Sequence, residues 1–423
     1  MVGIDSDDRL MNRDVALVMA ATFCFMASNM LISPLMAGFS ESLGAGGALM
    51  GVVAAMMNVV SLFCRPIAGN LADRTSKRTL VGIGAALYLV SSVWYTLAGS
   101  PASLIAARMV NGVGFACCSV CLATWMAMLL PIRHMGAGMG LYGTMNALAM
   151  AIGPAVGIRA QQLIGYRCTF LISTVLAALM VIAVLFVRNG GHPIRQGGAD
   201  AAGTDARPAA RRFTLRAIVE PRVVPLSLVF MCFSIPYFAN QSFLVEVADA
   251  RGLDVDVSLF FPLYAAALLV LRLAFRNLFD TKPFRLFFIV GTVAMVGMLL
   301  CLALMRNDWV LLLGAVLTAF SYGMMSSVTQ AEAVVIAGKE RSGIANSTYY
   351  IGIDLGMSLG PLPGGLIYGG LPIAWFYPLF MITMPLAWII HLSTARFVAR
   401  RGRNRTRHRT TVRIIAPNAV SLA

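Results

Sequence analysis

The sequence predicts an all-α membrane protein with twelve transmembrane helices arranged in two pseudo-symmetric halves of six. The first observation is composition: 59% of the 423 residues are hydrophobic and only 12% are charged, whereas soluble domains are about 45–50% apolar and about 25% charged. The second is that apolar runs of spanning length fall into two sets of six on either side of a polar gap. The third is an internal repeat between the two sets. Together these observations exclude an ordinary soluble enzyme.

The first six runs each have the length and apolar character of a helix that crosses the bilayer. They are Val15–Gly38, Leu49–Ala72, Leu80–Gly99, Leu104–Leu130, Met139–Ile158 and Thr169–Val187. A stretch rich in Gly, Ala and Arg follows, and its one short apolar segment begins at Phe213, so we expect a linker with one interfacial helix.

The second six runs follow this linker and have the same character. They are Val224–Val245, Leu259–Phe275, Leu286–Met305, Trp309–Ala337, Ile344–Tyr368 and Ile373–Leu392. The chain therefore divides into five expected parts. These are a cytoplasmic N-terminus (1–14), a first half (15–187), a cytoplasmic linker (188–223), a second half (224–394) and a basic cytoplasmic tail (395–423).

The positive charge predicts the orientation in the membrane. The chain has 33 Lys and Arg against 18 Asp and Glu, a net charge of +15. An N-terminus inside the cell places 25 of the basic residues in segments on the inner side and only four in outer loops. The positive-inside rule therefore predicts a multi-pass protein of the plasma (inner) membrane with both termini in the cytoplasm. We expect the arginine-rich tail to rest on anionic lipid and not on nucleic acid.

An internal repeat relates the two halves. The segment from Arg65 to Asp73 matches the segment from Arg272 to Asp280 in its Arg, Asn, Leu and Asp residues, and Gly153-Pro154 matches Gly360-Pro361. Both pairs are separated by 207 positions. Duplication of a six-helix unit is typical of secondary transporters, which hold the substrate between the halves near the middle of the membrane.

Two motifs carry a resemblance to a known family. Gly69-Asn-Leu-Ala-Asp73-Arg74-Thr-Ser-Lys77-Arg78 resembles the signature between the second and third helices of the major facilitator superfamily. The preceding Arg65-Pro66 looks like the drug and sugar efflux-permease branch. Arg108-Met-Val-Asn-Gly-Val-Gly114 resembles the fourth-helix signature, with Asn111 where Gln is more usual. The resemblance covers about residues 15–394.

The resemblance implies a latch on the cytoplasmic side. Gly69 would let the second helix approach the start of the eleventh, and Asp73 would accept from its free backbone N–H groups, with Arg74 and Arg78 in support. In the alternative interpretation these residues only mark a cytoplasmic loop. The second copy, which ends at Asp280, has an arginine in place of the glycine, and this weakens the case for a second latch.

Asp354 is the only acidic residue within the eleventh run. A carboxylate inside the membrane costs several kcal/mol unless it is paired, protonated or hydrated. Counting residues from the cytoplasmic helix ends places Arg65 at a similar depth, and the resemblance implies that the second and eleventh helices pack together. Our hypothesis is an Arg65–Asp354 ion pair that holds one conformation and breaks when Asp354 is protonated. The alternative is a structural Asp bonded to backbone and hydroxyl groups.

Arg272 and Arg108 are two further arginines within the predicted helices, and each is a candidate functional residue. The repeat places Arg272 opposite Asn146, so the mirrored position would hold only one charge. The resemblance implies that Arg108 takes part in proton coupling, by lowering the pKa of a carboxylate or by facing the cavity. The alternative for Arg108 is that it extends to the outer headgroups. Glu332 and Glu246 are further candidate proton carriers, although Glu246 could belong to a loop.

Polar residues on the helices that line the cavity in the superfamily fold are candidate substrate contacts, and the alternative for each is a bond between helices. These residues are Asn29, Asn111, Asn240, Gln241, Gln330 and Glu332.

The fifth run carries Ala149-x-x-x-Gly153-Pro154-x-x-Gly157, which resembles the exporter signature of antiporters. Pro would kink the helix and Gly would permit close packing. The fuller pattern lies in the eleventh run, at Gly360 and Pro361.

The sequence therefore predicts a secondary transporter, most simply a proton-coupled antiporter that exports a small amphipathic or sugar-like solute by alternating access. The alternatives are a proton-coupled uptake symporter and a non-transporting membrane sensor. The sequence shows no nucleophile–base pair, no phosphate-binding glycine loop and no His-rich cluster. We accordingly expect no enzyme activity, no metal and no cofactor, a proton gradient as the energy source, and a monomer.

Overall fold

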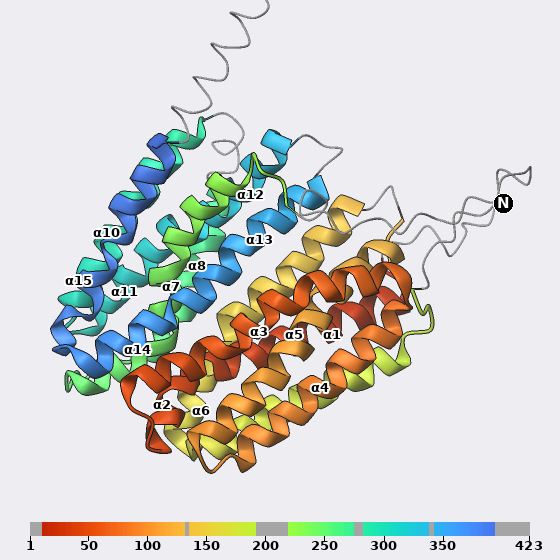
Figure 1. Ribbon diagram of the computed structural model, residues 1–423, viewed down its shortest axis with the longest axis horizontal. Coiled ribbons are helices and arrows are strands. Elements are labelled where there is room, and N and C mark those ends of the chain that lie inside the picture. The colour runs from red at the N-terminus through yellow and green to blue at the C-terminus, as the bar shows by residue number, and fades with distance from the viewer. Residues whose placement is uncertain (1–10, 132–134, 192–218, 275–281, 338–341, 394–423) are drawn as a thin grey trace, which may run out of the picture.

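The computed structural model describes residues 11–131, 135–191, 219–274, 282–337 and 342–393, and within those ranges it is helical and contains no strand. Nine of the described helices are long and apolar enough to cross a membrane. Figure 1 shows two groups of helices side by side, one coloured red to yellow and the other green to blue. We call them the N-half (11–191) and the C-half (219–393). The all-α membrane class is confirmed, and the count of twelve helices stays a prediction.

Two helices of the N-half begin at residues whose side chains accept from free backbone donors. The Asn12 side chain accepts from the N–H of Val15, and Ser100 caps the fourth predicted span in the same way at Ser103. The N-half consists of α1 (Arg13–Ile32), η2 (Ser33–Leu35), α2 (Met36–Ser42), α3 (Gly47–Arg74), α4 (Lys77–Leu97), α5 (Pro101–Leu129) and α6 (Met135–Phe186).

The helix α6 differs from the prediction because it joins two predicted spans. It covers the fifth and sixth runs without an intervening loop, and its only non-helical residue is Gly165, with φ 77° and ψ 173°. This conformation favours glycine because a Cβ would clash with the backbone. The predicted loop between the two spans is therefore a single turn at Gly165.

The C-half repeats the arrangement with more interruptions. It consists of α7 (Val224–Ala250), η5 (Val257–Leu259), α8 (Phe260–Ala274), α10 (Phe284–Ala303), α11 (Asp308–Thr318), η6 (Ala319–Gly323), α12 (Met324–Ala337), α13 (Ser342–Leu359), α14 (Pro361–Gly370), η8 (Ile373–Trp375), α15 (Phe376–Phe380) and a last helix at 383–393. The eleventh predicted span is split at Gly360, because Pro361 has no N–H and begins a new helix.

The bundle has two ends. We call the end at which α6 finishes and α7 begins the linker end, and the opposite end, marked by α2 and α14 in Figure 1, the distal end. One apolar core runs from the C-half into the distal part of the N-half, where it includes Leu35, Phe39 and Phe170. The linker end of the N-half has a separate core, around Val18 and Trp125. The two halves therefore share their core at the distal end.

The first residues after α6 are held against the N-half. Both carboxylate oxygens of Asp14 accept backbone N–H bonds, from Arg188 at 3.1 Å and from Asn189 at 2.8 Å. The backbone N–H groups of Lys77 and Arg78 donate to the carbonyls of Gly191 and Gly190, each at 3.2 Å. The rest of the predicted linker up to residue 218, and the basic tail, lie outside the described residues.

Candidate functional site

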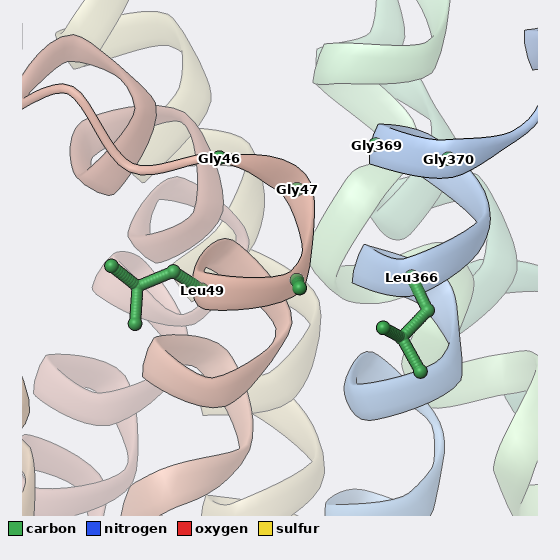
Figure 2. Close-up of a pocket in the computed structure, with 7 residues that line it drawn as sticks. Gly46, Gly47, Leu49, Leu366, Gly369 and Gly370 are labelled. Atoms are coloured by element: carbon green, nitrogen blue, oxygen red, sulfur yellow. The ribbon is translucent and has the colours of Figure 1, made fainter.

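The closest contact between the halves is a seam of glycines at the distal end. A Cβ on Gly51 of α3 would lie 2.5 Å from the carbonyl oxygen of Pro361, and a Cβ on Gly365 of α14 would lie 2.6 Å from the nitrogen of Gly51. Gly47 and Gly369 meet in the same way one turn away. Figure 2 shows the two helices facing each other at this end, with a shallow groove of about 380 Å³ beside them. The backbones of the two halves touch here with no side chain between them.

An ion pair joins the second and eleventh predicted spans nearer the middle of the bundle, where the eleventh span is formed by α13. Arg65 Nε of α3 lies 3.0 Å from Asp354 Oδ2 of α13, and the side chains are 23% and 4% exposed. The structure thus brings together the two residues that the depth argument paired. The N–H of Arg65 is aligned with Ser61 Oγ at 3.4 Å, and the guanidinium carbon lies 5.7 Å from the ring centre of Phe115. The Arg65 guanidinium therefore lies near three groups, which are the carboxylate of Asp354, the hydroxyl of Ser61 and the ring of Phe115.

The latch expected at the linker end stays a prediction. Among the described residues no atom would lie within 4 Å of a Cβ on Gly69. The described conformation brings the halves together at the distal end instead. Arg78 donates to the Leu185 carbonyl at 2.7 Å, within its own half. The side chains of Asp73 and Arg74, and the whole of Asp280, lie outside the described part of the chain.

Arg108 is a buried residue of the N-half. It is 1% exposed, and it donates to the carbonyls of Val53 at 3.1 Å and of Ala54 at 2.7 Å on α3. Arg108 does not extend to headgroups, and within the described residues its hydrogen bonds go to these carbonyls and to the Met57 sulfur, so that its role in proton coupling stays a prediction. Its five donors suit the carbonyl-rich surface of a neighbouring helix.

The mirrored position in the C-half holds no matching pair among the described contacts. Arg272 is exposed and donates to Ser327 Oγ at 2.9 Å. Asn146 donates to the Tyr142 carbonyl of its own helix at 3.1 Å. Among the described residues Arg272 and Asn146 share no hydrogen bond, and the asymmetry between the two sides stays a prediction.

The Gly-Pro motifs pack helices within each half. A Cβ on Gly153 would lie 2.6 Å from Met30 Cβ, and Gly157 meets the Leu31 carbonyl, both on α1. A Cβ on Gly360 would lie 2.7 Å from the Ile235 carbonyl of α7. At Pro154 the helix continues, whereas at Pro361 a new helix begins. The two motifs therefore make equivalent contacts, and only the second interrupts its helix.

The candidate cavity amides fall into different environments. Asn111 Nδ2 donates to Ser91 Oγ at 2.8 Å, and Asn240 Oδ1 accepts from the Tyr377 hydroxyl at 3.0 Å, so both join helices within one half. Gln241 Nε2 reaches the Met30 sulfur of the other half at 3.6 Å. Asn29 is buried with no partner for its amide. Gln330 and Glu332 are half-buried on α12.

Comparison with known proteins decides the family. The profile of the Major Facilitator Superfamily matches residues 18–361. The chain belongs to this superfamily. It is 23% identical over 318 residues to the multidrug resistance protein MdtL of Escherichia coli O81 (strain ED1a), covering 74% of this chain and 75% of MdtL. It is 20% identical over 374 residues to an uncharacterised MFS-type transporter of Methanocaldococcus jannaschii, covering 87% and 94%.

Solved structures of transporters share the fold. The nucleoside transporter NupG superposes with a TM-score of 0.68 at 12% identity, covering 91% of this chain and 99% of NupG. The peptide transporter POT in complex with alafosfalin superposes with a TM-score of 0.73 at 13% identity, covering 92% and 95%. The chain is thus a multi-pass membrane transporter, and the resemblance found in its motifs is confirmed.

Several features of this superfamily member were not found from its sequence. The sequence does contain a pattern that predicts the glycine seam. Gly47 and Gly51 are four residues apart, as are Gly365 and Gly369, and this is the spacing of closely packed membrane helices. No sequence pattern predicts the stacking of Tyr237 on Tyr322, whose ring centres lie 3.9 Å apart, because it depends on the π-helical turn η6.

Proposed function

We propose that this chain is a proton-coupled antiporter that exports a small amphipathic or sugar-like solute by alternating access. The observation that carries proton coupling is the Arg65–Asp354 ion pair, which joins the two halves inside the membrane. Protonation of Asp354 would remove one charge and release the contact, so that the two halves could reorient. The direction of transport is supported by the name of a relative, the multidrug resistance protein MdtL.

The orientation follows from the charge distribution. Because basic residues concentrate in the segments at the linker end, we place that end and both termini in the cytoplasm of the plasma membrane. The distal end then faces outward. The described conformation, with its shared core and glycine seam at the distal end, is on this assignment closed to the outside.

The test is a substrate-panel transport assay in inverted membrane vesicles with an imposed pH gradient. An antiporter accumulates its substrate in an acidic lumen, because protons leaving the lumen drive substrate in. We expect Asp354→Asn to lose this response to the gradient, and the matched variant Asp254→Asn, which removes an exposed acid at the distal end, to keep it.

Three results would contradict the proposal. Substrate that leaves an acidic lumen would indicate an uptake symporter. An unchanged response in Asp354→Asn would remove the carboxylate from the coupling mechanism. Absence of transport for every compound of a broad panel, in a correctly folded protein, would favour a membrane sensor.

A further inference from the structure

A second buried carboxylate lies in the contact between the halves. Glu246, on the distal part of α7, is 5% exposed, and its Oε2 has no hydrogen-bond partner. It is therefore part of a helix and of the interior, not of a loop. Within the described residues one oxygen of this buried carboxylate thus accepts no hydrogen bond, which is costly for the ionised form, whereas the protonated form carries no charge and has a proton to donate.

The carboxylate of Glu246 faces the other half of the molecule. A Cβ on Gly38 of α2 would lie 2.6 Å from Glu246 Oε1 and 2.6 Å from the hydroxyl oxygen of Tyr166 on α6. Glu246 Oε1 and the Tyr166 hydroxyl oxygen belong to different halves. Because each lies 2.6 Å from the same point, the two oxygens are no more than 5.2 Å apart. In the described conformation residues of the N-half therefore lie against Glu246.

The ionisable groups near Glu246 are acids and phenols. The charged groups that act on it in the described part are two more acids, Glu41 of α2 and Asp249 of its own helix. The other titratable groups around it are the phenols of Tyr166, Tyr368 and Tyr377. The nearby Arg251 is engaged elsewhere, since it donates to the carbonyls of Leu302 at 2.9 Å and Met305 at 3.0 Å.

We infer that Glu246 is a proton-binding site that controls closure of the distal end. Protonated Glu246 fits the contact between the halves, and ionised Glu246 is stable only when the distal end opens and water reaches it. Acid on the distal side therefore favours the closed conformation described above. This inference is separate from the role of Asp354, and it adds to the proposed function a proton site that faces the opposite side of the membrane.

The test measures the opening of the distal end without substrate or gradient. Spin labels are placed on Leu163→Cys and Trp309→Cys, exposed distal positions in different halves, in a full-length chain whose native cysteines are replaced. Electron–electron distances then give the closed population. Because burial disfavours the charged form, we expect that population to fall roughly tenfold from about pH 5.5 to about pH 8.5.

Variants of Glu246 decide the assignment. We expect Glu246→Gln to stay closed at every pH, Glu246→Asp to keep a pH-dependent opening, and Asp254→Asn, which removes an exposed acid at the distal end, to behave like the parent. Gel filtration verifies that each variant is folded. A parent that does not respond to pH, or a Glu246→Gln variant that still opens, would overturn the inference. The spin-label measurement of opening is independent of transport, so it stands even where the vesicle assay detects no antiport.

Discussion

At the scale of single residues, the molecule places two carboxylates in the contact between its halves, in opposite chemical settings. Asp354 lies against a cation, whereas Glu246 lies among acids and phenols. Variants of Arg65 therefore change the environment of Asp354 and leave that of Glu246 as it is, so that the two carboxylates can be separated by experiment.

The pair of Arg65 and Asp354 predicts a specific pattern of stability. Arg65→Leu leaves a buried carboxylate uncompensated, and we expect a loss of about 1–3 kcal/mol in the free energy of unfolding. The double variant Arg65→Leu, Asp354→Leu should recover most of that loss, since an apolar pair carries no desolvation cost. Thermal unfolding of the purified variants measures this, with a coupling of about 0.5–3 kcal/mol expected. Strictly additive losses would mean that the two residues do not interact.

Residue-level prediction succeeded where depth and the helix packing implied by the resemblance together indicated the partner, and it failed where many partners were possible. Arg65 and Asp354 could be matched by counting residues from helix ends, because few charged groups lie at that depth. Arg108 could not be placed in this way. Its partners are backbone carbonyls of α3, and every helix presents such groups at every depth. Which carbonyls Arg108 contacts depends on the rotation of α5 about its axis, and that rotation could not be predicted closely from the sequence.

At the scale of helices, the seam between α3 and α14 brings backbone against backbone. Helices in a membrane approach this closely only where side chains are absent, because the apolar solvent gives little drive for association and packing supplies the stability. The spacing of four residues keeps the glycines on one face of each helix. The position of the helices was predictable from apolar periodicity, whereas their contacts depended on these small residues.

Two adjacent glycines test the seam. A Cβ on Gly369 would lie 2.8 Å from Gly47 Cα, whereas a Cβ on Gly370 would meet no atom within 4 Å. We expect Gly369→Ala to destabilise the distal-closed conformation by about 1–3 kcal/mol through overpacking. Gly370→Ala should have no comparable effect. The spin-label distances at the distal end measure the difference, and equal behaviour of the two variants would show that the seam does not hold this end closed.

At the scale of the whole molecule, the repeat of 207 residues predicted two equivalent halves, and the described fold has them. What the repeat could not predict is the conformation. The free energies of the alternating states of such a protein differ by a few kcal/mol, and the same sequence encodes both. The latch at Gly69 and the seam at Gly51 belong to opposite ends, so one conformation shows only one of them in contact.

The orientation of the whole molecule can be tested with a native cysteine. Cys168 is exposed beside the Gly165 turn at the distal end, whereas the other seven cysteines are buried or half-buried. We expect a membrane-impermeant maleimide to label intact cells at Cys168, because the distal end faces outward on the charge distribution. Cys168→Ser should abolish the labelling. Labelling of Cys168 only after the cells are broken would reverse the assigned topology.

The glycine seam also breaks the symmetry that duplication created. Shifted by the repeat, Gly47 and Gly51 correspond to Asp254 and Ser258, and Gly365 corresponds to Ile158, so the contact between α6 and α8 has no such glycines. One edge of the bundle joins the halves backbone to backbone, and the other joins them through side chains such as the Arg159–Asp256 ion pair at 3.3 Å. We therefore expect the distal end to open by the loss of two unlike contacts, a backbone contact along α3 and α14 and a side-chain contact along α6 and α8.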